Sequence, residues 1–342
     1  MSEPARPPVP AAGPADGRPV LLVLRALGLG DLLAAVPALR ALRRAYPGHE
    51  LVLAAPAELA GAVRAVGCVD RLLPAGAPGR QVPDRLPPGA GRPELAVNLH
   101  GRGAASHRLL ETLRPRRLWA FRHPTVPEVP GPAWLEDEHE RVRWCRLLRW
   151  YGVTADPDDV RIEAPPARGA PSGAVVVHPG AQAASRRWPA DRFAAVVRAV
   201  RRAGVPVLVT AGPGEAPLAR SVAERGGLAP SAVLGADRRL TFEELCAVVG
   251  AARCLVVGDT GLAHLASALG ARSVVLFGPV SPELWGPPRD GPQVALWHPN
   301  GDGGAGRPGD PHADVPDPRL LRITVDEVLE AVLAPAAGGA RP

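Results

Sequence analysis

The 342-residue sequence contains no lysine, so arginine carries all of its permanent side-chain positive charge. A chain without lysine cannot form the phosphate-binding loop of nucleoside triphosphatases, because that loop needs one. The formal net charge is nevertheless +6. Alanine, proline, glycine and arginine are all abundant, as in proteins from GC-rich genomes. The charge therefore does not by itself indicate a nucleic-acid partner, and we expect none.

Aromatic residues and cysteines are also scarce. Aromatics make up 4% of the chain, so its cores must be built from alanine, valine and leucine. The four cysteines, Cys68, Cys145, Cys246 and Cys254, form no C-x-x-C pair. This spacing predicts reduced packing residues in a cytoplasmic protein. No run reaches the roughly 18 apolar residues of a membrane span, and residues 1–18 are too rich in Pro, Ala and Gly for a signal peptide.

Short apolar runs alternate regularly with segments of helical spacing along the rest of the chain. The first half predicts strands at 20–26, 50–55 and 94–103 and helices at 31–48, 57–67 and 138–153. The second half predicts strands at 174–180, 205–212, 231–235, 254–258 and 273–279 and helices at 190–204, 216–226, 241–253, 261–270 and 324–333. Residues 279–320 lack periodicity and are expected to be mostly loop. Thr241 with Glu244, and Thr324 with Glu327, have the spacing of capping boxes.

This alternation is typical of parallel sheets covered by helices on both faces. We therefore expect an α/β protein with two Rossmann-like, doubly wound domains that face each other across a cleft. The predicted limits are a disordered tail (1–18), an N-terminal acceptor domain (19–160), a linker (161–173), a C-terminal donor domain (174–334) and a second disordered tail (335–342). Ligands of such folds bind beyond the carboxyl ends of the strands, so residues at those ends are the candidates for function.

The stretch "LVVGDTGLAHLASALG" (255–270) places polar residues at one strand-to-helix corner. Asp259, Thr260 and Gly261 end the strand, and His264 lies one helical turn further on the same face as Thr260. A helix N-terminus offers free N–H groups to an anion, and glycine lets a ligand approach the backbone. Alternatively, Asp259 or Thr260 only caps the helix and His264 is a half-buried structural residue. We favour anion binding because the residues occur together.

A second corner of the same kind, "VVVHPGAQAASRRWPADRF" (175–193), carries Ser185, Arg186 and Arg187. Two guanidinium groups and a hydroxyl are suited to a diphosphate. The alternative is a solvated basic turn in which Trp188 packs the helix entry.

In the first half, "LRALGLGDLL" places Asp31 after Gly28 and Gly30, between a strand and a helix. These glycines do not make the G-x-G-x-x-G fingerprint of dinucleotide-binding enzymes, because Leu33 stands where its last glycine belongs. Asp31 is either a helix cap or a carboxylate that takes a proton from an incoming hydroxyl.

The three stretches "GLGDLLAAVPALRALRRAYP", "HPGAQAASRRWPADRF" and "VGDTGLAHLASALGARSVVLFGP" together resemble glycosyltransferase family 9, the heptosyltransferases. The resemblance spans about residues 20 to 330, and "DTGLAHLASALG" followed by "LFGP" is its most specific part. It implies a GT-B fold and inverting, metal-independent transfer of a heptose from an ADP-activated donor to a sugar hydroxyl.

The resemblance also implies a role for each matching residue. Asp31 would be the catalytic base, and Glu215 would contact the nucleotide ribose. The donor diphosphate and sugar would be bound by Ser185, Arg186, Arg187, Asp259, Thr260, Gly261 and His264. The family commonly has lysine where this chain has the arginine pair, which keeps the charge and changes the geometry.

Acceptor or sugar contacts are expected from Gly30 and, in the loop "NLHGRG", from His100 and Arg102, with a solvated loop as the equal alternative. No metal site is expected: the D-x-D of Asp156 and Asp158 falls at the predicted linker, and the acids near His312 lie in a Gly/Pro loop.

The predicted partners are a nucleotide-sugar donor, with ADP-heptose as first candidate, and a glycan or lipid-linked acceptor. No cofactor beyond this donor substrate is expected. We expect a monomer in the cytoplasm, with peripheral association at the inner face of the cell membrane as an open alternative. Two other functions remain open at this point: a nucleotide-sugar-binding protein without turnover, and a glycosyltransferase that uses another nucleotide-sugar. A nicotinamide-dependent oxidoreductase is not supported, because the complete glycine fingerprint is absent.

Overall fold

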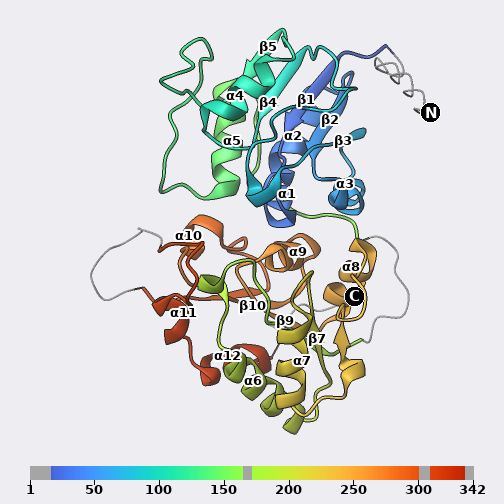
Figure 1. Ribbon diagram of the computed structural model, residues 1–342, viewed down its shortest axis with the longest axis vertical. Coiled ribbons are helices and arrows are strands. Elements are labelled where there is room, and N and C mark those ends of the chain that lie inside the picture. Colours follow the sequence, from blue (N-terminus) through green and yellow to red (C-terminus); the bar gives the residue numbers. More distant parts are fainter. Residues whose placement is uncertain (1–16, 165–171, 300–308, 336–342) are drawn as a thin grey trace, which may run out of the picture.

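The computed structural model describes residues 17–164, 172–299 and 309–335, and in it the chain forms two parallel α/β domains, one above the other in Figure 1. The predicted fold class is therefore confirmed. Most of the two predicted tails and the central part of the predicted linker lie outside the described residues. None of the helices in the described ranges combines the length and apolar character needed to cross a membrane.

The first domain is built on a five-stranded sheet with the order β3-β2-β1-β4-β5, in which every neighbouring pair is parallel. Its central strand β1 carries the run VLLVL, which is buried along its whole length because helices cover both faces of the sheet. The strands are β1 (Val20–Leu24), β2 (Glu50–Ala55), β3 (Arg71–Pro74), β4 (Leu95–Asn98) and β5 (Arg117–Trp119). The α-helices are α1 (Leu29–Ala34), α2 (Val36–Ala45), α3 (Ala60–Val66), α4 (Ala104–Glu111) and α5 (Glu140–Trp150).

The second domain has a six-stranded parallel sheet with the order β11-β10-β9-β6-β7-β8. Its strands are β6 (Val175–His178), β7 (Val207–Thr210), β8 (Val233–Leu234), β9 (Cys254–Gly258), β10 (Ser273–Leu276) and β11 (Gln293–Leu296). Its α-helices are α6 (Ala190–Arg202), α7 (Ala216–Arg225), α8 (Phe242–Ala251), α9 (Gly261–Leu269), α10 (Pro282–Trp285), α11 (Pro318–Arg322) and α12 (Val325–Leu333). Both predicted capping boxes are present, at the starts of α8 and α12.

Residues 279–320 are mostly loop in their described part, as expected. They also contain α10, the start of α11 and the strand β11, which was not predicted and pairs with β10 at the edge of the sheet. Residues of β11 are half-buried or exposed, so this short strand lacks the fully buried run of the central strands. An edge strand covered on fewer sides leaves a weaker hydrophobic pattern in the sequence.

Contacts between the two domains include those of the helices α1 with α9, α3 with α8, and α5 with α10. Figure 1 shows these helices at the facing ends of the two domains. Buried side chains of the first and second domains form one continuous apolar cluster, which includes Leu32 of α1, Val63 of α3, Val249 of α8 and Leu265 of α9. The helix starts α1 and α9 therefore meet at a packed junction between the domains.

Candidate active site

The candidate active site lies where the first turns of α1 and α9 meet. A Cβ atom on Gly30 would lie 2.8 Å from Cδ2 of His264, and one on Gly261 would lie 3.2 Å from Cβ of Leu29. Only glycine permits so close an approach of the two backbones. The structure thus brings the first turn of α1, which carries Asp31, directly against the helix that carries His264.

Asp31 is the third residue of α1 and is buried, with Gly28 at the N-cap position. One carboxylate oxygen of Asp31 lies 3.5 Å from Nη2 of Arg25, a residue 1% exposed at the end of β1. Nε of Arg25 also donates a hydrogen bond of 3.0 Å to the backbone carbonyl of Asp31. Sequence reasoning missed Arg25. The available signal was an arginine at the end of an apolar strand, immediately before a glycine-rich corner.

On the second domain, Ser185 and Arg186 belong to a short 3-10 helix, η3 (Ala184–Arg186), that crosses the end of β9. Nη1 of Arg186 lies 3.6 Å from a carboxylate oxygen of Asp259. Three buried polar atoms of this region have no hydrogen-bond partner among the described residues: Oγ of Ser185, Nε of Arg186 and Oγ1 of Thr260. Buried polar atoms are nearly always paired, so unpaired ones need an explanation.

Thr260 occupies the N-cap position of α9, but its hydroxyl does not cap the helix. The capping alternative therefore does not account for Thr260. Arg187 differs from its neighbour Arg186. It is exposed, and its Nε donates a hydrogen bond of 2.8 Å to the carbonyl of Ala181. The predicted pair of arginines is thus divided, and only Arg186 faces Asp259.

The ring of His264 packs edge-on against Trp285, with ring centroids 5.7 Å apart. Burial lowers the pKa of His264 to about 3, and the positive charge of Arg141 and a neighbouring histidine, His139, adds to this effect. His264 is therefore neutral at pH 7, and its ring can offer one N–H donor and one acceptor to a ligand.

Glu215 takes part in a separate cluster at the ends of β6 and β7. Its carboxylate accepts a hydrogen bond of 2.8 Å from the N–H of Gly212 and lies 3.5 Å from Nε2 of His178. The same carboxylate lies over Gly180, where a Cβ would be 2.0 Å from Oε2. Burial lowers the pKa of His178, and Glu215 opposes that shift. Sequence reasoning missed His178, although it ends a predicted strand.

His100 and Arg102 follow β4 at the same end of the first sheet as Asp31. The backbone N–H of His100 donates a hydrogen bond of 3.0 Å to the side-chain oxygen of Asn98. Arg102 is exposed, pairs with Glu136 and lies 5.8 Å above the ring of Trp134.

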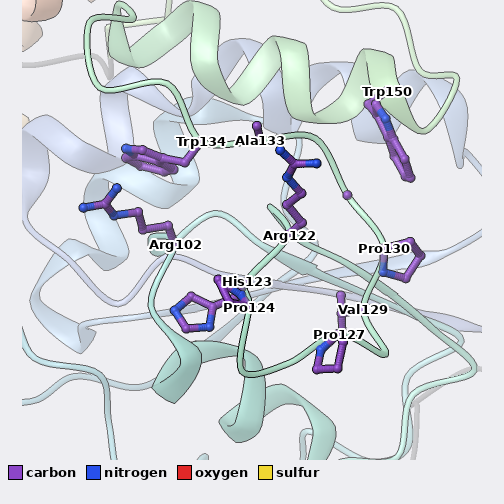
Figure 2. A pocket seen from close by; sticks show the side chains of 11 residues that line it. Arg102, Arg122, His123, Pro124, Pro127, Val129, Pro130, Ala133, Trp134 and Trp150 are labelled. Atoms are coloured by element: carbon purple, nitrogen blue, oxygen red, sulfur yellow. The ribbon is translucent and has the colours of Figure 1, made fainter.

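Arg102 and Trp134 line a cavity of about 930 Å³ in the first domain, shown in Figure 2. The loop between β5 and α5 forms most of its wall. Arg122 and Trp150 project from this loop and from the end of α5. The complete lining is Arg102, Arg122, His123, Pro124, Pro127, Val129, Pro130, Gly131, Ala133, Trp134 and Trp150. Cationic and aromatic groups thus share one cavity on the domain that carries Asp31.

The start of α5 supplies a further contact between the domains that the sequence did not reveal. Nε2 of His139 and Nη1 of Arg141 lie 3.1 and 2.8 Å from the same carbonyl oxygen, that of Gly286 after α10. Nδ1 of His139 accepts from the N–H of Arg141, so the other nitrogen, Nε2, carries the proton and donates to Gly286. This arrangement connects the first domain to the segment that carries Trp285.

The described parts of the chain contain no group of three or more His, Cys, Asp and Glu side chains placed to hold a metal ion. The acids considered in the sequence have other partners: Asp158 lies 3.6 Å from Arg141, and Asp156 accepts from the backbone of Asp158.

Residues 153–301 match the model of glycosyltransferase family 9 (heptosyltransferase). A lipopolysaccharide heptosyltransferase 3 from Escherichia coli is 30% identical over 113 residues, which is 33% of this chain and 33% of that protein. The aligned part thus spans about a third of the curated relative. These matches confirm the resemblance to glycosyltransferase family 9 that the sequence motifs indicated.

Solved structures agree over nearly the whole chain. A glycosyltransferase of family 9 from Veillonella parvula has a TM-score of 0.73 at 19% identity. The match covers 92% of this chain and 96% of the Veillonella chain. The E. coli heptosyltransferase WaaC, solved with ADP, has a TM-score of 0.62 at 18% identity. The match covers 90% of this chain and 95% of the WaaC chain. At these identities the likeness shows the fold, which is the GT-B arrangement of two Rossmann-like domains.

Proposed function

From the likeness to glycosyltransferase family 9, we propose that this chain transfers a sugar from a nucleotide-diphosphate donor to a hydroxyl group of a glycan or lipid-linked acceptor. The observation that carries the proposal is the set of three unpaired buried polar atoms, on Ser185, Arg186 and Thr260, on the domain opposite Asp31. Donor phosphate oxygens would supply the missing partners, since arginine, hydroxyl groups and a helix N-terminus are a common set of phosphate ligands.

The two sides of the junction would then divide the chemistry. The acceptor oxygen attacks the anomeric carbon, and the bond from that carbon to the leaving diphosphate oxygen breaks. Asp31 takes the proton of the acceptor hydroxyl. Arg186 and the N-terminus of α9 stabilise the negative charge that develops on the diphosphate. This single displacement inverts the anomeric centre and needs no metal ion.

His264, neutral at pH 7, would donate a hydrogen bond to the donor sugar or its phosphate without adding charge. Glu215, which follows β7 at the ligand-binding end of the second sheet, is our proposed contact for the nucleotide ribose. ADP-heptose is the first donor to test because WaaC was solved with ADP.

The acceptor would lie on the first domain. The cavity with Arg102, Arg122 and two tryptophans is suited to a sugar, because aromatic rings pack against apolar sugar faces and arginines bind anionic substituents. The cytoplasmic location, the monomeric state and the peripheral membrane association remain predictions.

The donor can be identified by thermal shift with ADP-, UDP-, GDP- and dTDP-sugars. We expect ADP-heptose to raise the melting temperature most. If another nucleotide-sugar stabilised the protein more, that compound would become the proposed donor, and the proposed reaction class would not change. Release of ADP from ADP-heptose, measured with and without EDTA, then separates an enzyme from a binding protein. Binding without ADP release or transfer would favour the protein without turnover, and loss of activity in EDTA would contradict metal-independent transfer.

A further inference from the structure

The strongest unassigned feature is a buried network of charged side chains beneath Asp31, centred on Arg25. The guanidinium group of Arg25 uses all three of its nitrogens. Nε donates to the carbonyl of Asp31, Nη1 donates to the carbonyl of Leu99, and Nη2 donates 3.0 Å to Oε1 of Glu140. Cζ of Arg25 lies over the ring of Trp144, 4.8 Å from its centre. Arg25 thereby joins the ends of β1 and β4 to the first turns of α1 and α5.

Glu140 completes this network. Oε1 of Glu140 accepts from Arg25 and, at 2.9 Å, from Nε1 of Trp144, while Oε2 accepts from Nη1 of Arg143. Arg143 in turn donates to the carbonyls of residues 135, 136 and 138 and lies over the ring of Trp134, 4.1 Å from its centre. Glu140, Arg25 and Arg143 are each less than 9% exposed.

A buried guanidinium is costly unless its charge and its donors are satisfied. Glu140 supplies a full negative charge to Arg25 at 3.0 Å, whereas the carboxylate of Asp31 lies at 3.5 Å. Because Glu140 is the nearer counter-charge, Arg25 orients Asp31 without having Asp31 as its main ion-pair partner. Without Glu140, the carboxylate of Asp31 would be the remaining counter-charge of Arg25 among these residues.

We propose that Arg25 is a positioning residue for the transfer reaction: it holds the carboxylate and the backbone of Asp31 in place, and Glu140 fixes Arg25 in the orientation that does so. This inference rests on the proposed function, in which Asp31 accepts the proton.

Glu140→Gln and Arg25→Lys test the proposal in the full-length chain. The probe is ADP-heptose, and the readout is ADP release per ADP-binding site, so that unfolded protein does not contribute. We expect both variants to lower kcat by about 10- to 100-fold, the effect of misplacing a reacting group by about 1 Å. The KM for the donor should stay within about twofold, because the network lies on the first domain.

A matched control is available in the same domain. Arg71 and Glu50 form a second pair with a buried glutamate, with Nε of Arg71 2.6 Å from Oε1 of Glu50, at the opposite ends of the strands. Glu50→Gln should affect stability and leave kcat unchanged. In the Asp31→Asn background, Glu140→Gln should cause no further loss of kcat, since a residue that acts through Asp31 has nothing left to position.

Three results would overturn the inference: an unchanged kcat in both variants, a loss no greater than that of Glu50→Gln, or effects of Glu140→Gln and Asp31→Asn that multiply. In each case the wild-type chain still releases ADP and the proposed function stands. A wild-type chain that releases no ADP with any donor of the panel would overturn the proposed function and this inference with it.

Discussion

Two buried polar groups on opposite sides of the domain junction, one around Arg186 and one around Arg25, differ in how their donors are used. On the second domain, Ser185, Arg186 and Thr260 keep buried polar atoms without partners among the described residues. On the first domain, Arg25 and Glu140 satisfy one another. The comparison teaches that charge alone does not identify a ligand site. Each side-chain nitrogen of Arg25 donates to a group of the protein itself, whereas Nε of Arg186 has no partner among the described residues and so could bind a substrate.

Asp31→Asn should have the largest effect on turnover, because it removes the one proposed base. We expect kcat to fall by about 10³-fold, within the range for loss of a general base. Binding should be unaffected, since ADP would contact the second domain. ADP release and the ADP-induced thermal shift measure the two effects separately. Near-normal turnover would remove Asp31 as the base.

Arg186→Ala should weaken ADP binding by about 10- to 100-fold, the cost of losing a charged hydrogen-bonding partner. Isothermal titration calorimetry with ADP measures this change. Arg225→Ala is a suitable control, because Arg225 is an exposed arginine of the same domain that pairs with Asp191. Equal affinities for both variants and the wild type would contradict a phosphate site at Arg186.

Gly30→Ala tests the contact between the two sides. The added Cβ would lie 2.8 Å from Cδ2 of His264, so the His264 ring or the junction must shift, and we expect roughly a tenfold loss of kcat. Gly28→Ala is the matched control, because its Cβ would meet Asp31 at an ordinary 3.6 Å. If the two variants have the same kcat, the close approach of α1 and α9 is not needed for turnover.

The smallest expected effect is on stability in mild acid. Burial lowers the pKa of His139 to about 4 and that of His264 to about 3. Below pH 6.5 the unfolded chain therefore binds protons that the folded chain does not, so the free energy of unfolding falls as the pH falls. The slope is at most about 1.4 kcal/mol per pH unit for each histidine.

Urea unfolding between pH 7 and pH 5 measures that slope. His139→Gln, on the first domain, and His264→Gln, on the second domain, should each reduce the fall of the free energy of unfolding with falling pH. A slope that neither substitution alters would show that other groups cause it.

Much of the fold followed from the sequence because buried parallel strands have a strong pattern. The run VLLVL of β1 and the run CLVVG of β9 are apolar throughout and end at glycine-containing corners. The short strands β3 and β5 were not predicted, since each begins with arginine and is only partly buried. The same weakness hid β11.

The candidate site was predictable in part for a related reason. Asp31, Thr260 and His264 stand at corners where a polar residue interrupts an apolar pattern, so each was visible locally. Arg25 and Glu140 are 115 positions apart, and their pairing depends on how α5 packs. No local pattern could have indicated it. The divergence of Arg186 and Arg187 likewise depends on the path of the loop around them.

The carbonyl oxygen of Gly286 accepts hydrogen bonds from both His139 and Arg141. Two donors on one rigid helix turn share a single acceptor, so any motion that lifts α10 away from α5 breaks both bonds in one step. Separation of α10 from α5 at this point would therefore cost both hydrogen bonds together.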